Sequence, residues 1–259
     1  MAENLPPDTD PPAASEAHWF GFRPVDPEGK APLVRQVFDN VAPSYDLMND
    51  LMSAGVHRLW KSTLVDLVAP RPGMVLLDVA GGTGDVALRF LERAPSAFVH
   101  VVDINEQMIR VGRDRAIDRG VLENVDWAVG DAERLPVANR SVDAYTIAFG
   151  LRNVTRIDAA IAEAHRVLRP GGRFFVLEFS RVVVPLLAGI YERYSFSVLP
   201  RLGQLVAGDR QSYQYLVESI RRFPDQEALA GRIRAAGFGQ VRYRNLTGGI
   251  AAIHSGWRL

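Results

Sequence analysis

Two acidic residues flank a run of small residues. Asp78 lies in the apolar segment 74–79, residues 80–84 (Ala-Gly-Gly-Thr-Gly) follow, and Asp85 comes next. Glycines allow a tight turn and let a ligand approach the backbone closely. A helix that begins after such a turn offers free N–H groups. This order of strand, glycine turn and helix is typical of a nucleotide-binding α/β fold.

The charge of this turn separates two classes of cofactor. The spacing Gly82-x-Gly84-x-x-Ala87 fits the loose dinucleotide fingerprint, so NAD is one alternative. S-adenosylmethionine carries an ammonium where NAD carries a pyrophosphate, and a carboxylate at Asp78 or Asp85 would attract the first and repel the second. We therefore favour S-adenosylmethionine over NAD, and over a glycine turn that binds no ligand.

Two further acidic residues follow the next strand-like segments. Asp103 ends the segment that begins at residue 98, and a carboxylate there can accept hydrogen bonds from both ribose hydroxyls of a cofactor. Asp131 and Ala132 lie in a turn after the third segment and could border the adenine. Together with Asp78, Gly82 and Gly84, these residues are candidates for cofactor binding.

Alternating elements must position these side chains. The strand-like segments are 74–79, 98–103, 124–129, 142–148 and 173–179, and the helix-like segments are 84–94, 105–120 and 156–168. The alternation predicts a parallel sheet with helices on both faces. Ligands of such sheets lie beyond the carboxyl ends of the strands, where Asp78, Asp103 and the turn 149–153 are expected.

The remaining segments are predicted to cover this core. Residues 1–18 are rich in Pro, Asp, Glu and Ala and are expected to form a disordered tail. Residues 19–259 are predicted to be one domain. It consists of an N-terminal helical cap (19–72), the cofactor-binding core (73–180), a helical insert over the substrate (181–223), and a helix with a closing β-hairpin (224–259). The apolar insert favours a hydrophobic substrate and ordinary helix packing equally.

Composition argues against several classes of function. The 259 residues contain 30 Lys+Arg and 30 Asp+Glu, so nothing indicates a nucleic-acid surface. There is no cysteine, which excludes disulfides, and five scattered histidines do not indicate a metal site. No apolar run reaches the roughly 18 residues of a membrane span. With neither a signal peptide nor a transit peptide evident, we expect a cytoplasmic protein.

Three stretches resemble the UbiE family of quinone-biosynthesis C-methyltransferases, which methylate demethylmenaquinol and polyprenyl-methoxybenzoquinol. They are residues 45–53 (Tyr-Asp-Leu-Met-Asn-Asp-Leu-Met-Ser), residues 77–85 and residues 149–154 (Phe-Gly-Leu-Arg-Asn-Val). The resemblance covers roughly residue 19 to the end. It implies an α/β fold of the class I, S-adenosylmethionine-dependent methyltransferases. That fold is a Rossmann-like sheet with N-terminal helices and a helical insert before the C-terminal hairpin.

The resemblance also implies roles for single residues. It puts the cofactor on Thr83, Asp103, Asp131 and Ala132, and the catalytic group on Asp85, Arg152 and Asn153, with Tyr45 close by. Arg152 could stabilise an ionised ring hydroxyl, and Asp85 could take its proton through a water. The alternatives are a structural salt bridge for Arg152 and a carboxylate that stabilises a helix N-terminus for Asp85.

The implied substrate is a polyprenyl quinol, whose tail resides in a bilayer. We therefore expect weak peripheral contact with the inner face of the membrane through the apolar insert, and no nucleic-acid partner. Other quinone-biosynthesis enzymes and a second copy of the chain are further candidate partners. Two alternatives stay open: methylation of another small apolar phenol, and a non-catalytic S-adenosylmethionine-binding subunit of a quinone-synthesis complex.

Overall fold

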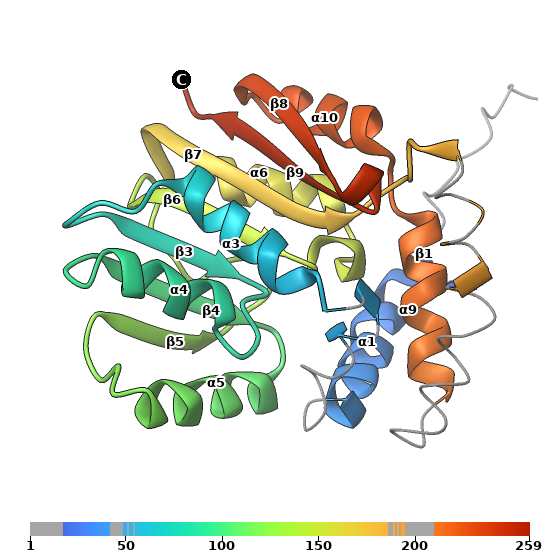
Figure 1. Cartoon of the computed structure of the whole chain (residues 1–259), viewed down its shortest axis with the longest axis horizontal. Helices are drawn as coiled ribbons and strands as arrows, with labels where there is room; N and C mark the ends of the chain where they lie inside the picture. The colour runs from blue at the N-terminus through green and yellow to red at the C-terminus, as the bar shows by residue number, and fades with distance from the viewer. Residues whose placement is uncertain are drawn as a thin grey trace, which may run out of the picture.

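Seven strands form one mixed sheet at the centre of the computed structural model, which describes residues 18–41, 49–50, 52–53, 55–185, 189, 191, 193–194 and 210–259. The strand order is β5-β4-β3-β6-β7-β9-β8 (Figure 1). The strands are β3 (Val75–Val79), β4 (Phe98–Asp103), β5 (Val125–Val129), β6 (Val142–Ala148), β7 (Leu168–Phe179), β8 (Gly239–Leu246) and β9 (Ala251–Trp257). The first five are parallel, and β9 runs antiparallel to β7 and β8.

Helices cover both faces of the sheet, as predicted. They are α3 (His57–Val68), α4 (Asp85–Arg93), α5 (Glu106–Asp118), α6 (Ile157–Val167) and α10 (Gln226–Ala235). Residues of α3 and α4 belong to one hydrophobic cluster, and residues of α6 and α10 belong to the cluster on the opposite face. The predicted class I methyltransferase architecture is therefore confirmed. The predicted closing hairpin is formed by β8 and β9.

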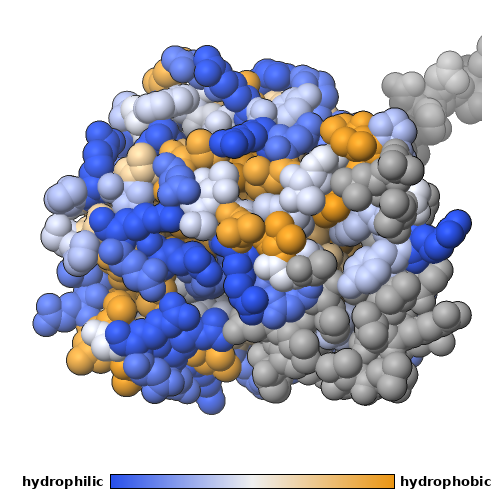
Figure 2. All heavy atoms as spheres, viewed as in Figure 1, coloured by the Kyte–Doolittle hydropathy of each residue, from blue (hydrophilic) through white to orange (hydrophobic). Residues whose placement is uncertain are grey.

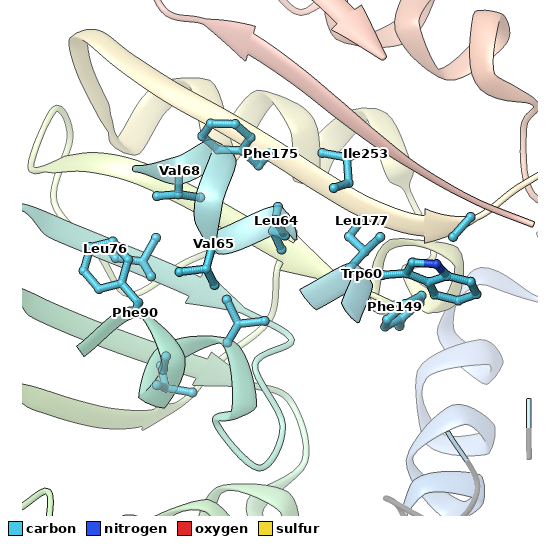
Figure 3. Packing of buried hydrophobic residues seen from close by; sticks show 14 of the residues in the cluster. Trp60, Leu64, Val65, Val68, Leu76, Phe90, Phe149, Phe175, Leu177 and Ile253 are labelled. Atoms are coloured by element: carbon cyan, nitrogen blue, oxygen red, sulfur yellow. The ribbon is translucent and has the colours of Figure 1, made fainter. Parts of the chain in front are cut away.

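The core on the first face is built around α3. Figure 3 shows Trp60, Leu64 and Val68 of this helix pointing toward the sheet residues Phe175 and Leu177. Full burial of a Leu or Val side chain, such as that of Leu64 or Val68, stabilises the fold by about 1.5–3 kcal/mol. The helix faces the sheet because its apolar residues recur at helical spacing.

A second group of elements lies beyond the carboxyl ends of the parallel strands. It contains β1 (His18–Phe20), β2 (Arg23–Val25), α1 (Pro27–Val41) and α9 (Arg210–Arg222), and α1 and α9 contact each other (Figure 1). The ring of Phe20 stacks on that of Tyr215, with centroids 4.1 Å apart. The predicted N-terminal helical cap therefore begins with a β-hairpin, and its first helix starts at Pro27. Proline is favoured at a first helical position, where its missing N–H removes no bond.

The fifth parallel strand also differs from its predicted bounds. Strand β7 begins at Leu168, five residues before the predicted start, because Leu168 already pairs with Val142. The register then shifts between Val142 and Ala144, and Gly171 has a φ of 78°. Residues 170–172 (Pro-Gly-Gly) therefore interrupt the regular pairing within strand β7, in the manner of a β-bulge.

Several predictions concern segments outside the described residues. These are residues 1–17 of the predicted tail 1–18, Tyr45, and most of residues 181–209 of the predicted insert 181–223. His18, the last residue of the predicted tail, instead begins strand β1. Within the part of the chain that is described, no helix has the length and apolarity needed to cross a membrane. The face seen in Figure 2 carries hydrophobic residues in small groups between hydrophilic ones.

Candidate active site

A cavity lies at the carboxyl ends of β3, β4 and β6, with α1 along one side. Of the predicted site residues, the structure brings five to its lining: Gly82, Asp103, Asp131, Ala132 and Asn153. The described lining includes neither Asp78, Thr83 and Gly84 nor Asp85 and Arg152. Tyr45 lies outside the described residues. The predicted residues thus divide into a group that borders the cavity and a group that supports its walls.

Asp103 is the buried anion of this lining. One carboxylate oxygen accepts a hydrogen bond from Gly82 N at 2.9 Å, and the other accepts one from Asn105 N at 2.8 Å. Burial raises the pKa of Asp103 to about 6, although these backbone N–H groups favour its charged form. A carboxylate has about four lone-pair sites, so Asp103 keeps acceptor capacity for a ligand hydroxyl.

Asp78 lies beneath the glycine turn and is fully buried. Its Oδ1 accepts a hydrogen bond from Thr146 Oγ1 at 2.7 Å, while its Oδ2 has no partner among the described residues. A Cβ placed on Gly81 would lie 3.0 Å from that oxygen. Burial raises the pKa of Asp78 to about 7. A buried acceptor without a donor is rare and indicates a place for a ligand donor or a water.

The glycines of the turn serve different purposes. Gly82 and Gly84 both have positive φ, 54° and 74°. A Cβ on Gly82 would approach Met108 Cε at 3.1 Å, beside the cavity, whereas a Cβ on Gly84 would overlap the ring of Trp127. The intervening Thr83 is buried and accepts a hydrogen bond from Arg115 at 3.0 Å. Of Gly82 and Gly84, Gly82 is therefore the one that borders the cavity.

Asp85 begins α4 and pairs with two cations. Its carboxylate lies 3.0 Å from Lys61 Nζ and 3.0 Å from Arg89 Nε. Burial opposes ionisation of Asp85, but these cations outweigh it and lower its pKa to about 2. Lys61 is itself buried, so the pair joins α3 to the end of the glycine turn.

Arg152 forms a buried ion pair below the short 3₁₀ helix η2 (Leu151–Asn153). Its Nη1 lies 3.0 Å from Glu178 Oε2, and both side chains are at most 3% exposed. Burial raises the pKa of Glu178, and Arg152 opposes that rise. Arg152 Nε has no hydrogen-bond partner among the described residues. The structure thus shows the salt bridge that was the alternative interpretation of Arg152, and it leaves Nε and Nη2 without a hydrogen-bond partner among the described residues.

The neighbouring Asn153 borders the cavity and is held from α9. Tyr215 donates its hydroxyl hydrogen to Asn153 Oδ1 at 3.0 Å. Burial raises the pKa of Tyr215 beyond its ordinary value, so its hydroxyl keeps the proton and acts as a donor.

Sequence reasoning did not identify α1 as a wall of the cavity. The cavity is lined by four residues of this helix, Ala31, Val34, Arg35 and Phe38. The nearby Asp39 accepts a hydrogen bond from Asn105 Nδ2 at 2.7 Å, which ties the helix to the start of α5. The helical spacing of Val34 and Phe38 was a usable signal, but the sequence does not show what that face covers.

Two residues of the lining have backbone conformations that are unusual for side chains with a Cβ. Ala80 follows β3 with a φ of 49°, and Phe149 follows β6 with a φ of 57°. Both positions border the cavity. A Cβ on Gly150 would overlap the Cβ of Ala80, so a glycine is required where these two turns meet.

Comparison with known proteins is consistent with this geometry. A family model described as the ubiE/COQ5 methyltransferase family matches residues 27–258. Ubiquinone/menaquinone biosynthesis C-methyltransferase UbiE of Paracoccus denitrificans is 60% identical over 249 residues, which are 96% of this chain and 99% of the relative. The protein of that name from Cereibacter sphaeroides is 60% identical over 246 residues, 95% of this chain and 98% of its own.

A solved structure shows the same fold at much lower identity. A SAM-dependent methyltransferase from Thermotoga maritima superposes with a TM-score of 0.63 at 19% identity. The match covers 87% of this chain and 100% of that structure.

Proposed function

This chain belongs to the ubiE/COQ5 methyltransferase family, and we propose that it transfers a methyl group from S-adenosylmethionine to a ring carbon of a polyprenylated quinol. The reaction would serve the synthesis of menaquinone, ubiquinone or both. The observation that supports this most directly is the 60% identity, over nearly the whole of both chains, to relatives named for that activity.

The residues at the cavity fit S-adenosylmethionine. Asp103 would accept the ribose hydroxyls, and Asp131 and Ala132 would border the adenine. Asp78, whose buried Oδ2 has no partner among the described residues, would attract the methionine ammonium from beneath the glycine turn, and Gly82 borders the cavity on that turn. Thr83, which the resemblance includes, would act by holding the turn through Arg115. When bound, the cofactor supplies an electrophilic methyl group on a sulfonium.

The ring carbon becomes nucleophilic when a neighbouring hydroxyl ionises. A phenol has a pKa of about 10, so ionising it at pH 7 costs roughly 4 kcal/mol. We assign Arg152 to lower this cost by donating to the ring oxygen. Its Nη1 is occupied by Glu178, so the donor would be Nε or Nη2, neither of which donates a hydrogen bond within the described residues. The pair with Glu178 holds the guanidinium in one orientation.

Asp85 and Asn153 complete the proposed catalytic group, with Tyr45 as a further member. Asp85 would accept the ring proton through a water. Since its ion pairs lower the pKa of Asp85 to about 2, Asp85 is a weak base, and it would act mainly by orienting the water that carries the proton to solvent. Asn153, fixed by Tyr215, would orient the substrate at the edge of the cavity.

The catalytic assignment of Arg152 predicts a split between binding and turnover. Arg152→Ala should leave the affinity for S-adenosylmethionine nearly unchanged and lower kcat by orders of magnitude, because its donor is needed as the ring oxygen ionises. Calorimetry and single-turnover assays at a temperature where the variant is folded would measure both. Loss of cofactor binding in the folded variant would contradict the assignment.

The overall reaction is tested by incubating the purified protein with S-adenosylmethionine and either a prenylated quinol or a non-prenylated phenol. Methylation of the prenylated ring alone supports the proposal. Equal rates on both substrates would favour a general phenol methyltransferase, and the absence of turnover with intact cofactor binding would favour a non-catalytic subunit. Quinone profiling of a knockout strain would show whether the ring is a naphthoquinol or a benzoquinol.

Contact with a membrane is a further part of the proposal. The substrate tail resides in a bilayer, and Val183 and Val184, at the start of the predicted insert, are 56% and 44% exposed. We propose that a cytoplasmic chain associates weakly with the inner face of the membrane through this segment. Vesicle flotation should therefore decrease when both valines are replaced by Asp, and unchanged flotation would contradict the contact.

A further inference from the structure

A second cavity, of about 410 Å³, lies beside the cofactor cavity. Its lining comes from the segment 18–21, the first turn of α1, the residues after η2, the C-terminal half of α9, and α10 (Figure 1). Val154 and Thr155 belong to the lining of both cavities, whereas Asp103 and the glycine turn border only the first. The second cavity is therefore separate from the cofactor-binding residues.

Basic side chains dominate this second cavity. Its lining includes five basic side chains, those of His18, Lys30, Arg152, Arg222 and Arg232. No Asp or Glu is among its described lining residues. The whole chain has no net charge, so this cavity concentrates positive charge locally. Such a cavity attracts anions and raises their local concentration.

Carboxylates outside the lining compensate only part of this charge. Arg152 pairs with Glu178, and Arg232 lies 3.2 Å from Asp158. Within the described residues, Lys30 and Arg222 form no ion pair with a carboxylate; Lys30 Nζ donates instead to the Val154 carbonyl at 2.8 Å. An ammonium has three hydrogens, so Lys30 keeps two donors for a ligand.

The orientation of Arg222 also suits an anion. Its guanidinium lies over the ring of Trp19, 3.2 Å from the ring centroid. Stacking occupies the face of the guanidinium and leaves the N–H donors at its edge available, in the planar fork that matches phosphate oxygens. Burial lowers the pKa of Lys30 to about 8, although Glu133 attracts its charge, and a bound anion would favour the protonated form.

We propose that this cavity binds a phosphate-bearing anion, held between Lys30 and Arg222. The phosphate could belong to a small soluble ester or to the headgroup of an anionic lipid, and both present the same chemistry to these two cations. This site goes beyond the proposed methyl transfer, because neither Lys30 nor Arg222 has a role in that reaction, although Arg152 lines the same cavity.

The test is calorimetry on the full chain saturated with S-adenosylhomocysteine, which fills the cofactor cavity. Glycerol 3-phosphate and inorganic phosphate are titrated at constant ionic strength, with acetate as the comparison anion. We expect saturable phosphate binding, weakened about tenfold by Arg222→Gln. The matched control is Arg242→Gln, which removes an exposed arginine on β8, outside the lining of both cavities, and should change the affinity less than about twofold.

Cosedimentation with vesicles identifies the source of the phosphate. If phosphatidylglycerol vesicles capture the protein more than phosphatidylcholine vesicles do, and Arg222→Gln abolishes the difference, the ligand is a lipid headgroup. Saturable binding of the soluble esters without such capture identifies a soluble ligand. The proposal is overturned by the absence of both, by equal binding of acetate, by equal losses in the two variants, or by phosphate binding that saturation with S-adenosylhomocysteine abolishes. None of these readouts depends on methyl transfer, so the proposed function can fail independently.

Discussion

Two turns border the cavity at the carboxyl ends of the parallel strands, and each lies above a buried carboxylate in a different electrostatic state. Asp78, beneath the glycine turn, accepts one hydrogen bond from the Thr146 hydroxyl and forms no ion pair within the described part of the chain. Glu178, beneath η2, pairs with Arg152 and accepts the backbone N–H groups of Arg152 and Phe179. Burial raises the pKa of both, but only Glu178 has a cation from its own chain in contact.

The different partners of Asp78 and Glu178 suggest that ligand binding affects the stability of the two turns to different extents. The carboxylate beneath η2 is satisfied within the protein, so its ion pair contributes to the fold before any ligand arrives, and only Arg152 Nε on the cation's side is buried without a partner among the described residues. The glycine turn leaves a buried oxygen unsatisfied, so a ligand ammonium at that place would relieve a cost already present in the free protein. Stability and cofactor affinity should therefore be coupled at the glycine turn and largely independent at η2.

The largest expected effect is at η2. Arg152→Ala should lower the free energy of unfolding by about 3–5 kcal/mol, because it leaves Glu178 buried without its cation. Urea denaturation would measure this. Arg169→Ala is the control, since its exposed pair with Asp143 should contribute less than about 1 kcal/mol. If both variants lose a similar amount of unfolding free energy, the buried ion pair contributes no more to stability than the exposed one. Combining Arg152→Met with Glu178→Leu should restore most of the stability.

The next effect concerns pH and Asp78. Its pKa is raised from 3.8 to about 7 in the folded protein, so between these pH values the folded state binds more protons than the unfolded state. The cofactor-free protein should therefore gain stability as the pH falls from 8 toward 4, on the order of a few kcal/mol from this group. Asp103, with a pKa of about 6, contributes in the same direction.

Denaturation at several pH values would isolate the share of Asp78. Asp78→Asn should remove its part of the pH dependence and leave the part due to Asp103. Saturation of the wild-type protein with S-adenosylhomocysteine should also flatten the dependence if the ligand ammonium lies beside Asp78. An identical slope in wild type and variant would mean that Asp78 does not titrate in this range.

Replacing Gly82 and Gly84 by alanine, one at a time, would distinguish a glycine needed for packing from one needed for ligand binding. Both positions have positive φ, so both variants carry a similar backbone cost of about 1 kcal/mol. Gly84→Ala should lose about 1–3 kcal/mol more, because its Cβ overlaps Trp127. Gly82→Ala should instead weaken S-adenosylhomocysteine binding about tenfold. Thermal unfolding and calorimetry provide the two readouts, and a reversed pattern would contradict the assignment of Gly82 to the cavity.

The smallest effect is expected at the contact between η2 and α9. Tyr215→Phe removes the hydrogen bond to Asn153 and keeps the stacking on Phe20, so it should cost about 1 kcal/mol of stability. Turnover should fall more than cofactor affinity, because Asn153 loses its fixed orientation. A change confined to cofactor affinity would show that Tyr215 does not act through Asn153.

The sequence predicts the sheet well because its signals are local. The segments that form β3, β4 and β6 are apolar runs bounded by glycine, acidic or turn residues, and their predicted limits agree with the structure to within one residue. The position of Asp103 at a strand end follows from the same pattern. Predictions of this kind need no knowledge of distant contacts.

The contacts of the site are not local, which is why sequence patterns do not reveal them. Arg152 and Glu178 are 26 residues apart, and Lys61 comes from a helix that precedes Asp85 by a whole strand. The sequence places Glu178 at the correct edge of the sheet but does not specify its partner. It also cannot show that α1 closes one side of the cavity, because an apolar helix face has the same pattern whether it covers a ligand or a core.

The left-handed conformations of Ala80 and Phe149 have a consequence for the evolution of stability. A non-glycine residue held at positive φ raises the energy of the folded state by about 1–2 kcal/mol. Ala80→Gly would thus be expected to raise the melting temperature and, at the same time, to make the backbone that lines the cavity more flexible. Selection for heat resistance alone would favour that exchange, whereas selection for a firmly held ligand would oppose it. Two strained residues at adjacent strand ends therefore mark a place where thermal tolerance and activity are expected to compete.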